Sequence, residues 1–154
     1  MQVLNVLNGY ANLVHVEGGC EWRDLLTQLG GTAIELGLAK EGIEAALIER
    51  ESSYPTGIAA EIGIAMPHAD SAFTAKDSVL VATLDKPVLF NPMGGGDETV
   101  PVEVVFLLLL DDIDKHLTLL KAVSKLIPDT DKIRTLFGDG AEATLAEVFD
   151  FAGN

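Results

Sequence analysis

The chain has 154 residues, 48% of them hydrophobic, and its 24 acidic and 10 basic residues give a formal net charge of −14 at pH 7. This length and composition exclude a disordered chain and predict one domain that spans residues 1–154. A surface this acidic repels nucleic-acid phosphates and anionic lipid, which argues against a nucleic-acid partner and against a membrane-binding face.

The first third of the chain predicts one strand and two helices. No signal-peptide pattern opens the sequence, so we expect a cytoplasmic protein. Residues Leu13–Val16 read as a short first strand. Apolar residues then recur at three- and four-residue intervals from Trp22 onward, which predicts a helix that begins near Glu21 and stops near Gly37. A second apolar stripe predicts a helix over Lys40–Glu51.

The middle of the chain predicts four more strand segments. A Pro55-Thr56-Gly57 turn leads into a short apolar strand at Ile62–Ala65. Residues Ser78–Leu84 have the composition of a strand, and Pro87–Phe90 reads as a short strand or edge segment. The longest apolar stretch, Val100–Leu110, is too short to cross a bilayer, so we expect no membrane insertion. A strand that is apolar on both faces belongs inside a sheet covered on two sides.

The connection between the last two long strands predicts how they pair. It leaves no room for a crossover helix, so the sheet is expected to be mixed rather than all parallel. The Gly94-Gly95-Gly96 run in this connection reads only as a hairpin tip. It is not followed by the lysine and hydroxyl residue of a P-loop, which excludes nucleotide binding there.

The last third of the chain predicts helices. Asp112 or Asp114 is a suitable cap for a helix that Pro128 ends, and two short helices follow at Thr130–Phe137 and Ala141–Phe151. Helices before, between and after the strands predict an α/β fold, with a mixed β-sheet of about five strands flanked by helices on both faces.

Two of the three histidines come just after apolar strands. His68 follows the Ile62–Ala65 strand at once, on a path that Pro67 stiffens, and His116 begins the helix after the Val100–Leu110 strand. If these strands are parallel neighbours, both rings open into one crevice at the strand ends. Arg50, at the end of the second helix, is a candidate cation for the same crevice.

Two imidazoles and an arginine suit a phosphoryl group. His68 could attack phosphorus through one ring nitrogen while a backbone carbonyl keeps the other nitrogen protonated, with His116 and Arg50 stabilising the charge. Thr56 and the amide of Gly57 are candidate donors to the phosphate oxygens. Taken singly, each residue has a plainer interpretation: His116 as a solvated helix residue, Arg50 as a charge that is solvated or paired with a neighbouring glutamate, and Thr56-Gly57 as a turn.

Other chemistries fit less well. Three scattered histidines with loose carboxylates make a weak metal site, so we expect no metal and no cofactor. The single cysteine, Cys20, cannot form an internal disulfide, and its acidic neighbours disfavour the thiolate.

Two segments together resemble a known family. The first is Arg50-Glu51, Pro55-Thr56-Gly57 and Gly63-Ile64-Ala65-Met66-Pro67-His68; the second is Val105-Phe106-Leu107-Leu108 followed by the helix start His116-Leu117-Thr118-Leu119-Leu120. They resemble the signatures of the fructose/mannitol-type EIIA proteins of the bacterial sugar phosphotransferase system. The spacing from Thr56 to His68, with Pro87, Phe90 and Met93-Gly94 downstream, looks most like the galactitol-specific branch.

The resemblance implies a function. His68 would be the phosphorylated residue, carrying the group on its tele nitrogen, with His116 and Arg50 as its active-site companions. The phosphoryl group would come from the carrier protein HPr and pass to a cysteine of an EIIB component during uptake of a galactitol-like sugar. A regulatory protein switched by the same phosphorylation is the alternative, whereas two retained histidines argue against a binding domain without chemistry.

A phosphocarrier must dock two proteins in turn, so we expect an exposed apolar rim around His68. The candidates are the apolar residues next to it in the sequence: Met66, Ala69, Ala72 and Phe73.

Overall fold

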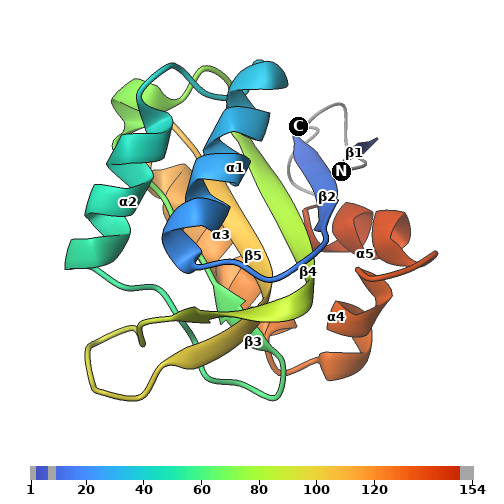
Figure 1. The fold of residues 1–154 in the computed structure, drawn as a ribbon. Coiled ribbons are helices and arrows are strands. Elements are labelled where there is room, and N and C mark those ends of the chain that lie inside the picture. Colours follow the sequence, from blue (N-terminus) through green and yellow to red (C-terminus); the bar gives the residue numbers. More distant parts are fainter. Residues whose placement is uncertain (1–2, 7–9, 150–154) are drawn as a thin grey trace.

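The computed structural model describes residues 3–6 and 10–149, and its centre is a mixed sheet (Figure 1). The strand order across the sheet is β1-β2-β4-β5-β3. The pairs β2–β4 and β3–β5 are parallel, and the pairs β1–β2 and β4–β5 are antiparallel. The strands are β1 Val3–Val6, β2 Ala11–Val16, β3 Gly63–Ala65, β4 Ser78–Phe90 and β5 Val100–Leu109.

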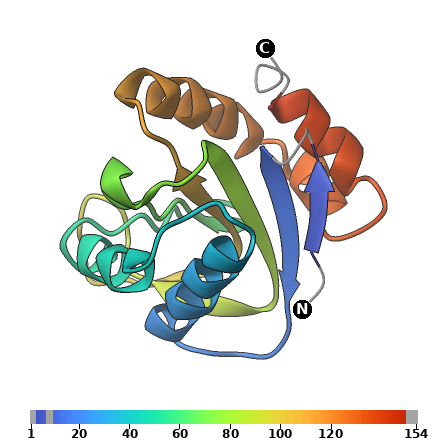
Figure 2. The same ribbon diagram turned by 90° about the horizontal axis from the view of Figure 1, so that it is seen from above.

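Helices cover both faces of this sheet, as Figure 2 shows from above. The helices α1 (Trp22–Glu35) and α2 (Ile43–Ser53) pack on one face, and α3 (Ile113–Leu126), α4 (Thr130–Thr135) and α5 (Ala141–Val148) pack on the other. Alternate residues of the central strands supply the two cores, because successive side chains of a strand point to opposite faces. The predicted architecture is therefore confirmed: a mixed sheet of five strands with helices on both sides.

Two strand predictions were wrong in detail. Leu13–Val16 is not the first strand, because β1 precedes it and pairs antiparallel with β2. The segments Ser78–Leu84 and Pro87–Phe90 belong to one strand, β4. The pairing of β4 with β5 jumps between Thr83 and Val88, so Pro87 lies in an irregular stretch where its missing N–H breaks no ladder bond.

The helix predictions hold with shifted ends. The second helix begins at Ile43 rather than Lys40, because Gly42 has φ of 95° and cannot belong to the helix. The last helix ends at Val148, and the predicted continuation to Phe151 lies outside the described residues. The cap of α3 is Asp112, whose side chain accepts a bond from the Asp114 amide. No helix in the described part of the chain is long and apolar enough to cross a membrane.

Candidate active site

The fold brings His68 and His116 together. His68 continues along β5 just after β3, where the Leu108 amide donates to the Pro67 carbonyl at 3.1 Å, and His116 lies in the first turn of α3 just after β5. The ring centroids are 5.7 Å apart and the ring planes are perpendicular. The two rings meet because β3 and β5 are parallel neighbours, so both strands deliver their following residues to the same edge of the sheet.

The His68 ring is held in one tautomer. Its Nδ1 lies 3.1 Å from the carbonyl oxygen of Met66. A carbonyl can only accept, so Nδ1 carries the proton and Nε2 keeps its lone pair. Burial lowers the pKa of the His68 imidazole, the charges of Arg50 and His116 lower it further, and the bond to Met66 opposes the change. The ring is therefore neutral at neutral pH, with Nε2 as its nucleophilic atom.

His116 has a similar environment and Arg50 acts on both rings. The His116 ring bonds to the backbone carbonyl of Leu110, and burial lowers the pKa of this imidazole, with the charge of Arg50 adding to the effect. The Arg50 guanidinium lies 4.7 Å from the ring centroid of Tyr54. Among the described residues no carboxylate forms an ion pair with Arg50, so of its two plainer interpretations the paired charge is wrong, whereas the side chain is exposed as a solvated charge would be.

The charge of Arg50 gives a pH-dependent prediction. In Arg50→Gln, the pKa of His68 and of His116 should rise, because a positive charge that disfavours both imidazolium forms is removed. An NMR titration of the two rings checks this result. In Arg23→Gln, which removes a guanidinium that lies over the Trp22 ring instead, both pKa values should stay at their wild-type positions. Equal titration curves for wild type and Arg50→Gln would contradict the placement of this charge.

A buried hydrogen-bond network supports the His68 loop. The Glu51 carboxylate is 3% exposed and accepts from the Thr56 amide at 2.6 Å and from the Thr56 hydroxyl at 2.9 Å. The same hydroxyl accepts from the Met66 amide at 3.0 Å. Burial raises the pKa of Glu51, against the two bonds from Thr56 that lower it. The chain Glu51–Thr56–Met66 therefore ends at the residue whose carbonyl orients His68.

Thr56 and Gly57 both have hydrogen-bond partners within the protein. The Thr56 hydroxyl has two protein partners and is buried, and the Gly57 amide donates to the Asn91 carbonyl at 3.1 Å. A Cβ on Gly57 would lie 2.6 Å from the Asn91 oxygen, so glycine is required by the close approach of two backbones. In this structure the donor groups of both residues bind within the protein, which gives them a structural role, and their role as phosphate donors stays a prediction.

The glycine run forms more than the predicted hairpin tip. His68 lines a surface pocket of about 480 Å³ whose walls are Ser53–Thr56 on one side and Met93–Gly95 on the other. The Met93 amide donates to the Gly57 carbonyl at 2.8 Å, which fixes the loop after β4 against the turn after α2. Gly94 and Gly95 of the hairpin tip thus also line the pocket that holds His68. Sequence reasoning missed this, although the apolar Met93 at a loop tip is a signal.

The exposed apolar rim exists, but with other residues. Met66 is 5% exposed and belongs to the core, while Ala69 and Phe73 pack partly against the opposite core and Ala72 is exposed. The large exposed apolar side chains near the two histidines are Tyr54 (64% exposed) and Met93 (51%), which line the pocket, and Leu117 (53%), which follows His116.

Known proteins resemble this chain in sequence. A nitrogen regulatory protein of Klebsiella oxytoca is 28% identical over all of this chain and 93% of its own length. The galactitol-specific EIIA component of the phosphotransferase system in Escherichia coli K12 is 27% identical over 73% of this chain and 75% of its own length.

Solved structures resemble this chain in fold, and a family model matches most of its residues. The PTS IIA protein PtxA of Streptococcus mutans has a TM-score of 0.68 at 24% identity, covering 90% of this chain and 86% of its own. An Escherichia coli complex of enzyme IIAMTL with phosphorylated enzyme IIBMTL has a TM-score of 0.67 at 15% identity, covering 92% and 94%. Because residues 11–150 match the family described as phosphoenolpyruvate-dependent sugar phosphotransferase system, EIIA 2, the chain belongs to that family.

Proposed function

We propose that this protein is a phosphocarrier that accepts a phosphoryl group from phospho-HPr on Nε2 of His68 and passes it to a cysteine of an EIIB component. The observation that carries the proposal is the bond between His68 Nδ1 and the Met66 carbonyl, which leaves Nε2 as the free nucleophile. The perpendicular contact with the His116 ring and the charge of Arg50, which lowers the pKa of His68, also support the proposal.

The transfer needs no net change in protonation. The Nε2 lone pair of neutral His68 forms a bond to phosphorus as the phosphorus–nitrogen bond to the histidine of HPr breaks. In the next step a cysteine thiolate of EIIB forms a phosphorus–sulfur bond as the bond to Nε2 breaks. His68 keeps its Nδ1 proton throughout, donated to Met66, so the ring returns to the tautomer in which it began.

The surroundings of His68 suit a passing phosphoryl group. Negative charge spreads over the three equatorial oxygens in the transition state, and positive neighbours stabilise it. Arg50 supplies a permanent positive charge, and His116 adds a hydrogen bond to the phosphoryl oxygens when its ring is protonated, since the N–H of the neutral ring is donated to the Leu110 carbonyl. Since both imidazoles have lowered pKa values, His68 is unprotonated and competent to attack at neutral pH.

The exposed apolar rim supports docking of partner proteins. We expect Met93→Asp to raise the KM for phospho-HPr about tenfold or more, because a charge replaces an exposed apolar side chain in the pocket that holds His68. Phe137→Asp is the matched control, since Phe137 is also exposed but follows α4 and lines no part of the pocket. Steady-state kinetics at varied phospho-HPr concentration measure the effect, and an equal loss in both variants would contradict it.

The sequence relatives support two uses of this chemistry. Similarity to the galactitol-specific component supports coupling to uptake of a galactitol-like sugar. A second candidate is a regulatory protein whose phosphorylation state controls binding to a target, favoured by the match to a nitrogen regulatory protein over the whole chain. Transfer from the phosphorylated protein to an EIIB cysteine distinguishes the two, because only the transport component requires it.

The proposal is tested by reconstituting the relay. Incubation with phosphoenolpyruvate, enzyme I and HPr should give one phosphoryl adduct by intact mass, labile in acid and stable in base as a phosphoramidate is. Omission of HPr should abolish the adduct. A protein that remains unmodified in the complete mixture, while HPr itself is phosphorylated, would refute the proposal.

A further inference from the structure

The segment that follows His68 also contacts the part of the chain that carries His116. Residues 69–77 leave His68, form the short 3-10 helix η2 (Ser71–Phe73), and enter β4 at Ser78. Their backbone is fixed to the connection between α1 and α2: the Lys40 amide donates to the Phe73 carbonyl at 2.8 Å, and the Ala75 amide donates to the Leu38 carbonyl at 2.9 Å. The segment is therefore anchored to the helical layer before it reaches β4.

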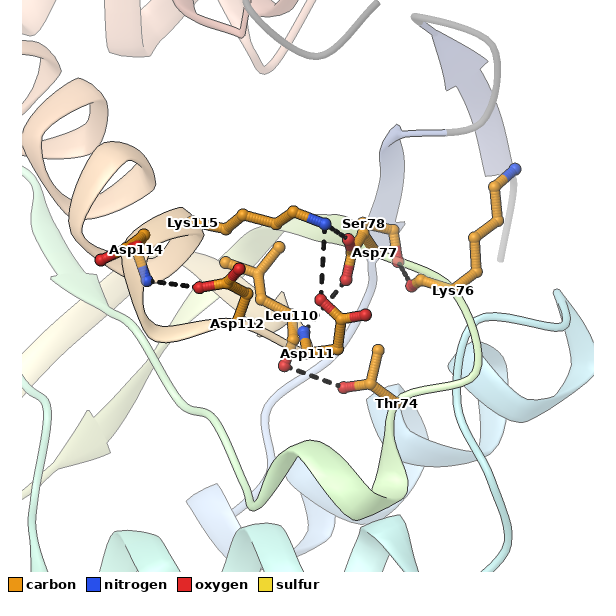
Figure 3. A network of polar contacts seen from close by, with 9 residues as sticks. All are labelled: Thr74, Lys76, Asp77, Ser78, Leu110, Asp111, Asp112, Asp114 and Lys115. Atoms are coloured by element: carbon orange, nitrogen blue, oxygen red, sulfur yellow. Dashed lines mark hydrogen bonds and ion pairs between the residues drawn. The ribbon is translucent and has the colours of Figure 1, made fainter.

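The side chains of this segment bind the junction between β5 and α3 (Figure 3). The Thr74 hydroxyl donates to the Leu110 carbonyl at 3.4 Å. One oxygen of the Asp77 carboxylate accepts from the Asp111 amide at 3.0 Å, and the other forms an ion pair with the Lys115 ammonium. Lys115 also lies 3.4 Å from the Asp111 carboxylate. Asp77 thus bonds to the end of the strand and to the first turn of the helix at the same time.

The junction that Asp77 binds is the one that carries His116. Lys115 is the residue before His116, and Leu110, whose carbonyl accepts from the His116 ring, is the residue before Asp111. None of these contacts belongs to the β-ladder or to the helix, so they fix the junction independently of the secondary structure. A lysine and a carboxylate on a fully exposed surface would contribute little, but here the carboxylate also accepts a backbone bond.

We propose that Asp77 is a positioning residue for His116, setting its place and its charge opposite His68 through the Asp111 amide and Lys115. The inference rests on the proposed phosphotransfer function of the two histidines. A displacement of a catalytic group by about 1 Å can reduce a rate about a hundredfold, so a fixed junction matters for a relay between two rings.

The charges around His116 determine in which direction each substitution should shift the pKa of this ring. Arg50 on α2 and burial lower the pKa of this ring, whereas Asp77 is the negative group that raises it, and His68 lies against it from the loop after β3. Lys115 neutralises part of the Asp77 charge, and Asp111, Asp112 and Asp114 are the other acidic groups of the junction. Removing Asp77 or Lys115 should therefore move the His116 titration in opposite directions.

The test uses three variants of the full chain. Asp77→Asn keeps an oxygen for the Asp111 amide but removes the charge, so the pKa of His116 should fall and kcat for phosphoryl transfer should drop about fivefold with little change in KM. Lys115→Met should raise the pKa of His116, because the Asp77 charge is no longer neutralised. Asp114→Asn is the matched control. It removes the same charge from the junction, but among the described residues the Asp114 side chain forms no ion pair with Lys115.

The outcomes are separable by NMR titration of His116 and by the pH profile of transfer. Opposite shifts in Asp77→Asn and Lys115→Met, with a wild-type curve for Asp114→Asn, support the proposal. If Asp77→Asn and Asp114→Asn give the same His116 titration curve, and the protein still takes up phosphoryl groups, the role of Asp77 is refuted. The proposed function then stands. If the wild-type protein takes up no phosphoryl group, the proposed function fails, and the role of Asp77 in transfer fails with it.

Discussion

We expect His68→Ala to lose phosphoryl uptake from phospho-HPr by at least about a thousandfold, because the variant removes the atom that bonds to phosphorus. The His116 ring is 5.7 Å away between centroids, but of the two rings it is His68 that lines the pocket. The free energy of unfolding should change by only about 1 kcal/mol, since the half-buried ring makes one hydrogen bond. Intact-mass measurement and chemical denaturation check the two parts.

The control for this variant is His15→Ala. His15 is exposed on β2 and its ring contacts the Thr83 hydroxyl, so its loss removes an imidazole without touching the pocket. Uptake should stay at the wild-type level. Full phosphorylation of His68→Ala, or equal losses in both variants, would show that the phosphoryl group is carried elsewhere in the chain.

The two histidines could be predicted from the sequence because their positions depend on strand order. Apolar strands that end at Ala65 and Leu109 deliver the next residues to one edge of a sheet, and the short link between β4 and β5 predicts their antiparallel pairing. The sequence did not specify the parallel pairing of β3 with β5; it entered the prediction as a condition, which the structure meets.

The side chains that support the site could not be predicted in the same way. Glu51 reads as a surface residue beside Arg50, and only the turn after α2 brings the Thr56 amide and hydroxyl over its carboxylate. The position of Met93 is fixed by the bond from its amide to the Gly57 carbonyl, a contact between distant segments that no local pattern specifies. Met66 is different: it shares a face with Ile62 and Ile64 at a spacing of two, so its burial was readable.

The buried hydrogen bonds of Thr56 give the second large prediction. Thr56→Val keeps the shape of the side chain but removes the hydroxyl, so the Met66 amide and one Glu51 oxygen lose their buried partners. Leaving buried polar groups unpaired costs about 2–4 kcal/mol of the free energy of unfolding. Phosphoryl uptake should slow as well, because the Met66 carbonyl that holds His68 Nδ1 is no longer fixed. Chemical denaturation and the HPr assay measure both losses.

The pH dependence of this variant has a definite sign. Burial already raises the pKa of Glu51, and Thr56→Val removes one of the two bonds that oppose the rise, so this pKa should rise further. A carboxyl with a raised folded-state pKa takes stability away as pH increases from its unfolded to its folded pKa. Stability of Thr56→Val should therefore fall more than that of wild type between acidic and neutral pH, as denaturation at a series of pH values will measure.

Thr56→Ser separates the structural role of Thr56 from direct phosphate binding. Serine keeps the hydroxyl and loses one methyl group, so stability should fall by only about 1 kcal/mol and phosphoryl uptake should remain near the wild-type rate. If the hydroxyl instead bound the phosphoryl group, Thr56→Val would be as stable as wild type and still transfer slowly. The structure predicts that stability and rate fall together in valine and are both retained in serine, because the same hydroxyl links Glu51 to the loop of His68.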